Sequence, residues 1–441
     1  MAGTRRTTDW TRFSWAAAPV ALVYLAHAWF GANSSFAALT LAALEALLLA
    51  AFLARSASRR LLDARFAPLL ALLVLVLAAV LATMTGLPPG GAHPVWSYVQ
   101  AAPAVTIDRA GSLIELFKLL GLACILLVGV LVAAESGLAE HARRLLVWGG
   151  GAFCLWMLLV FLGGSQLTGG RLMGGFGSPN SAATVVGVLI LLALPDLARA
   201  PAVRSDAPPA ERVLARAPQA GLLLLFAGCF LLTASRWGSA SLAAALLVFL
   251  VAQLLSGRMK LVQALAAGAL VAVAAALLLL LKGQLLVERM GSTVLDQDAR
   301  GAIFAVHWDN FLRAPLFGDG LGTFAAANRM LLDAANFPAL GDVRDLHNVY
   351  LQWLEEAGVV GAAPMFLLVA AVIGLTVWSM RGRRRGRAWL NALLAADVMV
   401  LAHGLSDFAL QTPSIAAFWA LLLGLQLGGA TAPRGRGAGH V

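Results

Sequence analysis

The residue best suited to chemistry in this chain is a histidine at the edge of a long apolar run. His347 ends a long polar segment, and the chain then continues through Asn348-Val349-Tyr350 into sequence apolar enough to enter a membrane. Histidine titrates near neutral pH, so it can take a proton from a hydroxyl group. His403 and Asp407 are four residues apart, and this spacing predicts either that both line one cavity or that they hold each other.

The composition places these residues in a membrane protein. Of the 441 residues, 60% are hydrophobic and 12% are charged, against about 25% charged in a soluble domain. Apolar runs close to the roughly 20 residues that cross a bilayer recur along the chain. The sequence therefore predicts an all-α integral membrane protein with about 12 transmembrane helices. These runs lie near 14–32, 35–54, 66–86, 112–134, 144–164, 180–198, 218–235, 238–255, 261–282, 358–380, 389–410 and 413–430.

The basic residues predict how these spans are oriented. With the N-terminus in the cytoplasm, every inner segment is basic, from Arg5 and Arg6 at the start to Arg434 and Arg436 at the end. This is the positive-inside bias, and it places both termini in the cytoplasm. Anionic lipid of the inner leaflet also accounts for the net charge of +10 without any nucleic-acid partner. The first span lacks a cleavage site and is predicted to be an anchor.

The outer face is then left with few segments, namely 31–34, 87–111, 164–180, 235–238 and 284–347. Only the last is long enough for a small subdomain. A helix is predicted over 298–313 because Pro315 stops it, followed by a glycine turn over 318–322 and a loop over 335–345. A second helix is predicted to begin with Asn348 as its cap and to break at Gly358. The three cysteines, Cys124, Cys154 and Cys229, fall inside spans and are predicted to be packing residues.

Five sequence blocks, in order, resemble the O-antigen ligase/polymerase family, integral membrane enzymes that build bacterial surface polysaccharides. The resemblance covers residues 165–430. Trp237 departs from the resemblance, because in the family a small residue commonly follows the arginine that corresponds to Arg236. The blocks are Gly175-Phe176-Gly177-Ser178-Pro179-Asn180, Ser235-Arg236, Ser292-Thr293-Val294 to Arg300 with Pro315 to Phe324, His347 to Gly361, and His403-Gly404-Leu405-Ser406-Asp407-Phe408.

The resemblance predicts three regions. Residues 1–164 would be N-terminal membrane helices, residues 165–430 the family-like membrane domain with the periplasmic loop 284–347, and residues 431–441 a cytoplasmic tail. It implies a multi-pass protein of the bacterial inner membrane with its active site facing the periplasm. The implied partners are an undecaprenyl-diphosphate-linked glycan donor, a sugar or lipid A-core acceptor, membrane lipid and other polysaccharide-assembly proteins.

The implied reaction is glycosyl transfer from this donor to an acceptor hydroxyl, with no cofactor. The departing diphosphate gains negative charge, and the guanidinium fork of arginine suits its oxygens. The candidates for diphosphate binding are Arg236, Arg300, Arg171 and Arg289. His347 is the candidate catalytic base, with a pKa of about 6–7, and a helix beginning after it would favour the neutral ring. Asn180, His403 and Asp407 are the candidate cavity-lining residues.

Each candidate also has a plainer interpretation. Arg236 could simply reach the membrane surface from a hairpin tip, and His347 could lie on a solvated loop. Arg300 could pair with Asp296 or Asp298, whose Asp-x-Asp spacing also occurs in metal-dependent glycosyltransferases. We predict no metal site, because the family's motif does not require one. Glu115 and Lys118, three residues apart, are expected to pair with each other.

Two further classes of protein compete with this interpretation. A 12-span secondary transporter fits the number of spans, but the loop 55–65 lacks the Gly-x-x-x-Asp-Arg pattern of major facilitator proteins. A transferase of the oligosaccharyltransferase sort would place acidic metal ligands in the first outer loop, and 31–34 has none. Within the family, Ile107-Asp108-Arg109 resembles exopolysaccharide polymerases, so a polymerase is favoured over an O-antigen ligase that attaches glycan to lipid A-core.

Overall fold

A computed structural model describes residues 2–55, 66–164, 170–198, 208, 211, 214–260, 262–263, 300–341, 343–381 and 386–431. Over these residues the chain is helical, with no strand. Eleven of the predicted spans correspond to helices, and the twelfth, 261–282, lies almost wholly outside the described residues. The long helices are α1 (Ala2–Ala28), α2 (Ser35–Ala54), α4 (Ala67–Thr83), α6 (Arg109–Ala134), α7 (Ser136–Leu162), α8 (Pro179–Ala198), α10 (Ala217–Thr233), α11 (Arg236–Leu255), α16 (Val349–Ser379), α17 (Arg387–His403) and α18 (Pro413–Thr431).

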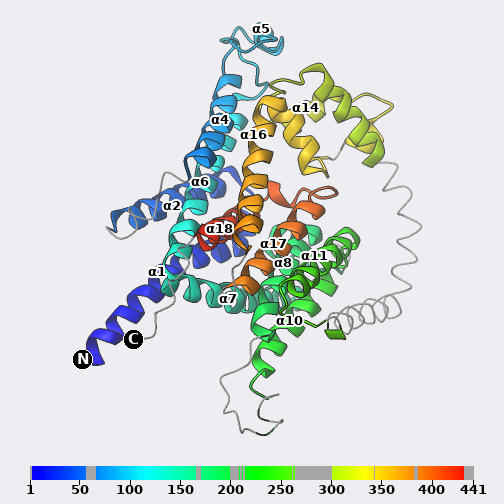
Figure 1. Cartoon of the computed structure of the whole chain (residues 1–441). Helices are drawn as coiled ribbons and strands as arrows, with labels where there is room; N and C mark the ends of the chain where they lie inside the picture. The colour runs from blue at the N-terminus through cyan, green and yellow to red at the C-terminus, as the bar shows by residue number, and fades with distance from the viewer. Residues whose placement is uncertain are drawn as a thin grey trace.

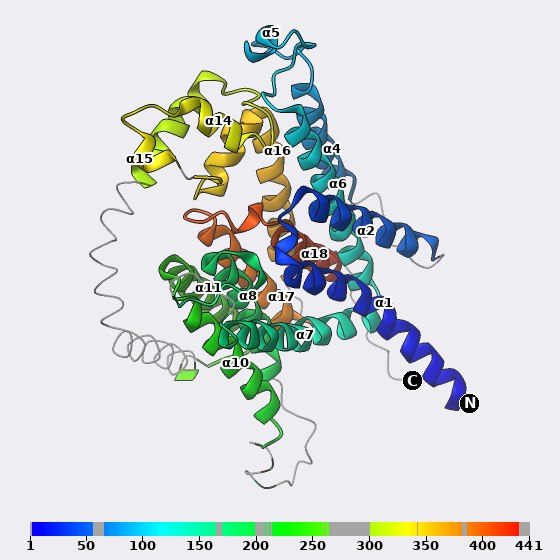
Figure 2. The ribbon, with the colours of Figure 1, turned by 180° about the vertical axis from the view of Figure 1, so that it is seen from behind.

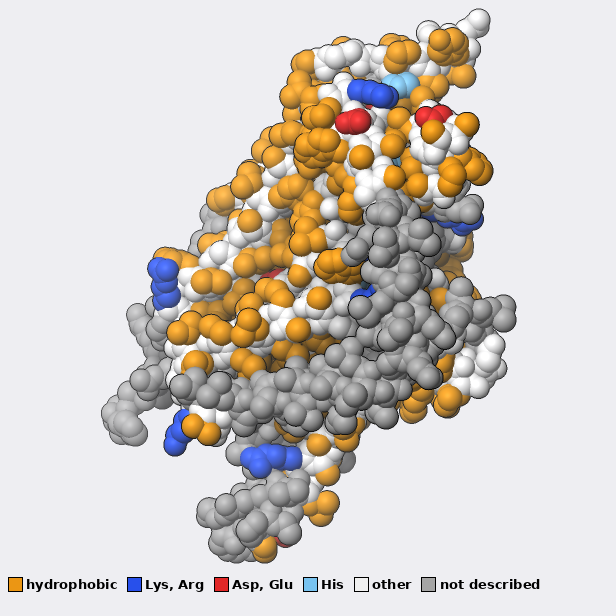
Figure 3. Space-filling view, turned by 90° about the vertical axis from the view of Figure 1, so that its right-hand side faces the viewer, with side chains coloured by type: hydrophobic (Ala, Val, Ile, Leu, Met, Phe, Trp, Pro, Cys, Tyr) orange, Lys and Arg blue, Asp and Glu red, His pale blue; other side chains and the backbone are white. Residues whose placement is uncertain are grey.

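Length and composition identify seven of these helices as able to cross a membrane: α2, α6, α7, α8, α11, α16 and α18. Helices α4 and α10 are apolar but shorter. Large hydrophobic side chains remain exposed on the body of the molecule, among them Leu47, Val74 and Leu247. Figure 3 shows one such face, where hydrophobic side chains dominate the described surface between its two ends. An apolar exterior of this kind is what a lipid environment requires, and the chain is an α-helical, multi-pass membrane protein.

Helix α18 forms the centre of the helical body. Figures 1 and 2 show it enclosed by α1, α2, α6, α16 and α17, and nearly all of its residues are buried. Gly424 and Gly428 lie four residues apart and meet the backbone of α6 near Leu126 and Val130, while Gly129 of α6 meets α18 in return. Small residues at this spacing let two membrane helices pack backbone to backbone.

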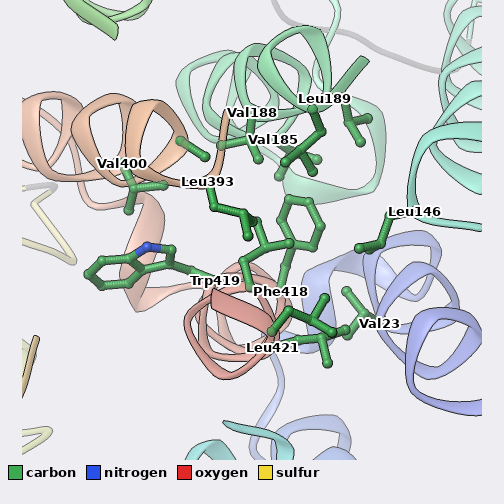
Figure 4. Close-up of a cluster of buried hydrophobic side chains, with 14 of the residues drawn as sticks. Val23, Leu146, Val185, Val188, Leu189, Leu393, Val400, Phe418, Trp419 and Leu421 are labelled. Carbon is green, nitrogen blue, oxygen red and sulfur yellow. The ribbon is translucent and has the colours of Figure 1, made fainter. Parts of the chain in front are cut away.

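Elsewhere around α18, side chains from four other helices close the core. Phe418 and Leu421 pack near Val23 of α1, Leu146 of α7 and Leu189 of α8, while Trp419 lies towards Val400 of α17 (Figure 4). The N-terminal helices therefore share one core with the C-terminal helices.

The described part of the outer loop forms a small helical subdomain at one end of the molecule. A helix spans 300–313, as predicted, and it is followed by the glycine turn. Two further helices were not predicted: α14 (Phe324–Leu331), and α15 (Phe337–Leu340) within the expected loop 335–345. Figure 1 shows α14 at the same end as α5 (Val95–Tyr98), far from the N-terminal end of α1.

A network of buried polar groups fixes this subdomain to α16. The Glu356 carboxylate accepts hydrogen bonds from the backbone N–H groups of Gly322 at 2.9 Å and Phe324 at 3.0 Å. The N–H groups of Asp319 and Gly320 bond to the carbonyls of Glu355 and Glu356. The chain then turns at Gly358, whose φ of 58° and ψ of −176° interrupt the helix as the sequence predicts. Asn348 caps the first half of α16, also as predicted.

We expect substitution of Gly358 by alanine to lower the stability of the folded protein. Backbone in this region favours glycine at a cost of about 1–3 kcal/mol for other residues, and a Cβ atom would collide with the Leu316 backbone. The matched control is Gly374→Ala in the same helix, where no atom lies within 4 Å of an added Cβ. Thermal unfolding in detergent should show a lower midpoint for Gly358→Ala than for the wild type, and no decrease for the control. Equal midpoints would mean that the corner in α16 is not a constraint.

Candidate functional site

His347 is held where the outer subdomain meets the end of α17. The Asn348 side chain accepts hydrogen bonds from the N–H groups of Tyr350 at 3.1 Å and Leu351 at 3.0 Å, so a helix begins directly after the histidine. The N–H of Val349 bonds to the Gly404 carbonyl at 2.9 Å. The imidazole ring lies edge-on to Phe408, with 5.0 Å between ring centroids. His347 is thus positioned against the His403–Phe408 block.

That block in turn contacts the start of α8. Asp407 Oδ1 accepts a hydrogen bond from Asn180 Nδ2 at 3.1 Å, and His403 Nδ1 lies 2.7 Å from the Thr184 hydroxyl. His403 and Asp407 therefore each have a partner on α8 and do not hold each other. Both side chains are fully buried. Thr184, four residues after Asn180 on the same helix face, was not predicted as a site residue.

Arg171 joins the glycine-rich segment to the turn between α10 and α11. Its guanidinium donates to Asn180 Oδ1 at 3.3 Å, to the Thr233 carbonyl at 2.8 Å and to the Ala234 carbonyl at 3.3 Å. Arg236, the first residue of α11, is exposed on the same turn. Two arginines far apart in sequence therefore both lie at the turn between α10 and α11.

Arg300 reaches the site from the start of the helix over 300–313. Its Nη1 atom lies 3.5 Å from the Ser406 carbonyl, and its charge acts on both His347 and Asp407. Arg289 lies outside the described residues, as do Asp296 and Asp298. The structure therefore brings His347 and Arg300 together with Asn180, His403, Asp407 and Arg171, and it places Arg236 at the adjoining turn.

Several buried polar atoms of this cluster have no protein partner. Within the described part of the chain they include His347 Nδ1, His403 Nε2, Asp407 Oδ2 and the Ser181 hydroxyl. Buried polar groups in native proteins are nearly always paired, because an unpaired group loses its hydrogen bonds to water. Unpaired atoms of this kind on His347, His403 and Asp407, together with the hydroxyl beside Asn180, indicate a site for a polar ligand. Ser181 carried no sequence signal beyond its position beside Asn180.

Burial and the nearby guanidinium control ionisation here. Burial, helped by the charge of Arg300, lowers the pKa of His347 to about 4. The predicted pKa of about 6–7 for His347 is therefore wrong, because the ring is more buried than its position in a loop suggested. Burial raises the pKa of Asp407 to about 6, against the opposing effects of Asn180 and Arg300. At neutral pH the His347 ring is neutral and can accept a proton.

A large apolar cavity lies beside this cluster. It has a volume of about 690 Å³ and is lined by α2, α4, α6, α16 and α18. Tyr350 and Gly404, next to the segments that carry His347 and Asp407, form part of its wall. The Glu115–Lys118 ion pair, predicted from its spacing, lines the cavity as well. A long apolar chain could therefore lie within reach of the polar cluster.

The fold and site together define a multi-pass helical membrane protein with a buried polar site beside an apolar cavity. Residues 221–366, about a third of the chain, match the family model described as O-antigen ligase. This match confirms, over residues 221–366, the resemblance to the O-antigen ligase/polymerase family that the sequence predicted. The match includes Arg236, Arg300 and His347, while Arg171, Asn180, His403 and Asp407 lie outside it. No curated protein shows a significant match to the chain.

The low pKa of His347 leads to a prediction that does not require a substrate. Diethyl pyrocarbonate reacts with neutral imidazole, and the pKa of His347 is about 4 rather than the ordinary 6.5. Modification of His347, followed by mass spectrometry, should therefore continue as the pH falls from 7 to 5. In Arg300→Gln the pKa should rise, so modification should decline from a higher pH. An identical pH profile in both proteins would show that Arg300 does not act on this ring.

Proposed function

We propose that this protein is a metal-independent glycosyltransferase that moves an undecaprenyl-diphosphate-linked glycan to an acceptor sugar hydroxyl at the periplasmic face of the inner membrane. The observation that carries the proposal is the position of His347. It lies in the segment that matches the O-antigen ligase model, its Nδ1 atom is buried without a partner, and Arg300 is close enough to lower its pKa.

In this reaction the neutral His347 ring takes the proton of the attacking hydroxyl. The hydroxyl oxygen forms a bond to the anomeric carbon of the donor, while the bond from that carbon to the diphosphate breaks. The diphosphate leaves with the bonding electrons, and cations placed near it stabilise the added charge. We assign this role to Arg300 and Arg171, with Arg236 at the rim and Arg289 as a further candidate. General-base assistance of this kind contributes about 10²–10⁴-fold to a rate.

The apolar cavity supports a lipid-linked donor. Its wall consists mostly of aliphatic and aromatic side chains of the membrane helices. The isoprenoid chain of the donor would occupy it, with the diphosphate at the polar cluster beside Tyr350. Asn180, His403 and Asp407 would line the polar part of the site. This arrangement needs the outer end of α17 to face the periplasm, with both chain termini in the cytoplasm.

A polymerase is the favoured member of the class, and an O-antigen ligase is the alternative. The Ile107-Asp108-Arg109 segment, which resembles exopolysaccharide polymerases, is tied to the outer subdomain. The Ile107 N–H bonds to the Asp319 carbonyl at 2.9 Å, and Asp108 caps α6 by accepting from the Gly111 N–H at 3.0 Å. The guanidinium of Arg109 lies over the Trp96 ring, 4.2 Å from its centroid. The segment is therefore part of the surface that an acceptor glycan would meet.

A deletion strain tests this function directly. Surface chains bearing a single repeat unit would support a polymerase, and long polymer stranded on the lipid carrier would support the ligase. Complementation with His347→Ala or His347→Gln should fail, because glutamine can form hydrogen bonds but cannot take a proton. His141→Gln, which alters a histidine of α7 outside the cluster, is the control and should restore the glycan. Unchanged glycan in the deletion strain, or full activity of His347→Gln, would contradict the proposal.

We expect the arginines to be sensitive even to lysine. An ammonium group keeps the charge of the guanidinium but cannot bind two diphosphate oxygens at once. Purified Arg300→Lys and Arg236→Lys should each transfer glycan at a small fraction of the wild-type rate. EDTA should leave the wild-type rate unchanged. Arg329→Lys, an exposed position in α14, should transfer normally. Wild-type turnover by Arg300→Lys would remove it from diphosphate binding, and loss of wild-type activity in EDTA would indicate a metal.

A further inference from the structure

A second cavity lies in the outer subdomain, apart from the cluster around His347. Its volume is about 520 Å³, and its walls are the loop 89–94, the segment 313–319 and one face of α14. None of the residues assigned above to the base, the diphosphate or the polar cluster lines it. Figures 1 and 2 show the segments that surround it gathered at the same end of the molecule, beside the upper part of α16.

Three polar side chains in this cavity offer hydrogen bonds of both kinds. His93 Nδ1 accepts from the Val95 N–H at 3.2 Å, which places the ring proton on Nε2 as a donor. Asp319 uses Oδ2 to accept from Asn310 at 2.7 Å, and its other oxygen has no hydrogen-bond partner among the described residues. Arg313 is exposed at the same wall and its charge acts on Asp319. A ligand with several hydroxyl groups would find two donors and an acceptor here.

Apart from Asn310, whose amide donates to Asp319 and Glu355, the remaining lining is mostly apolar, and the Asp319 backbone is held in place. Pro94, Phe317 and Met330 line the cavity between the polar groups. The Asp319 backbone is fixed at both ends, because its N–H bonds to the Glu355 carbonyl at 3.0 Å and its carbonyl accepts from Ile107 at 2.9 Å. Cavities with mostly apolar walls and a few fixed polar groups are typical of sites for small organic ligands. A sugar ring has this dual character, with hydroxyl groups at its edge and C–H groups on its faces.

We propose that this cavity is a saccharide subsite, which binds the glycan chain at a distance from the atoms that react. The proposal rests on the proposed glycosyltransferase function and extends it. Asp319 is bonded to Glu355, six residues along α16 from Val349, or about 9 Å of helical rise. A glycan held in both places must therefore span more than one sugar. A glycan bound at the subsite has a raised effective concentration at the cluster around His347. The subsite would therefore favour repeated transfer to the same glycan chain.

The test combines a blocked cavity with a binding measurement. Met330→Trp adds bulk at an exposed residue of the cavity wall. A double variant, His93→Gln with Arg313→Gln, removes the hydrogen bonds that these two side chains would donate to a ligand. The control is Arg329→Gln, which loses the same charge from α14 but does not line the cavity. The probe is the oligosaccharide released by mild acid from the strain's own surface polysaccharide, titrated into the full-length protein in nanodiscs. Binding should weaken about tenfold or more in both cavity variants, because the tryptophan fills space that the probe needs and the double variant loses hydrogen bonds to it.

A second measurement separates this proposal from the proposed function. In cells, the cavity variants should still make glycan, but with a shorter distribution of chain lengths, whereas Arg329→Gln should give the wild-type distribution. His347→Ala should bind the probe normally although it transfers nothing. If Met330→Trp and the double variant bind the probe as wild type does, the subsite is refuted whatever the transfer activity. If wild-type protein binds the probe in this cavity but transfers no glycan, the proposed function fails and the binding site stands.

Discussion

The attachment of the outer subdomain to α16 through two adjacent glutamates is the constraint on which the site depends. A carboxylate is costly to bury unless it is fully hydrogen-bonded, and Glu356 accepts from two backbone N–H groups and from Gln352. Glu355 Oε1 lies 2.7 Å from His307 Nδ1 and accepts from Asn310 Nδ2 at 2.9 Å. These bonds fix the turn over 318–322 and the start of α16 together. They thereby fix His347 at one end of the helix and Asp319 along its length.

The polar cluster then forms because three parts of the chain that are far apart in sequence meet at the same place. Helix α8 supplies Asn180 and Thr184, the end of α17 supplies His403 and Asp407, and the outer subdomain supplies His347 and Arg300. Close packing of α18 against α6, and of α17 against α8, holds the membrane helices together beneath them. A rigid helical body that carries a polar site at its loops is a common arrangement for catalysis. The saccharide subsite that we propose uses the same subdomain, at its outer wall.

Much of this arrangement could be predicted from local sequence. Helices at eleven of the predicted positions, the Asn348 cap and the break at Gly358 follow from hydropathy and from the chemistry of single residues, and the structure confirms them. Seven of these helices are long and apolar enough to cross a membrane. Partners across the fold could not be predicted. Four-residue spacing suggested that His403 and Asp407 might pair, but each faces a different residue of α8. Glu355 and Glu356 look like an exposed helix face in sequence, because nothing local shows that a glycine turn covers them. Helix α14 was missed because its eight residues are too few for a clear periodic signal.

The pKa of His347 shows most clearly why tertiary structure was needed. The residue type predicts a group that titrates near neutrality, whereas burial and Arg300 lower its pKa to about 4. A base with so low a pKa is always neutral at physiological pH but has a weak tendency to take a proton. In the proposed reaction the donor's diphosphate binds to Arg300 and offsets its positive charge. The pKa of His347 would then rise towards its ordinary value, so the ring becomes a stronger base when the donor is in place. The same arginine would thus both bind the leaving group and make the strength of the base depend on its presence.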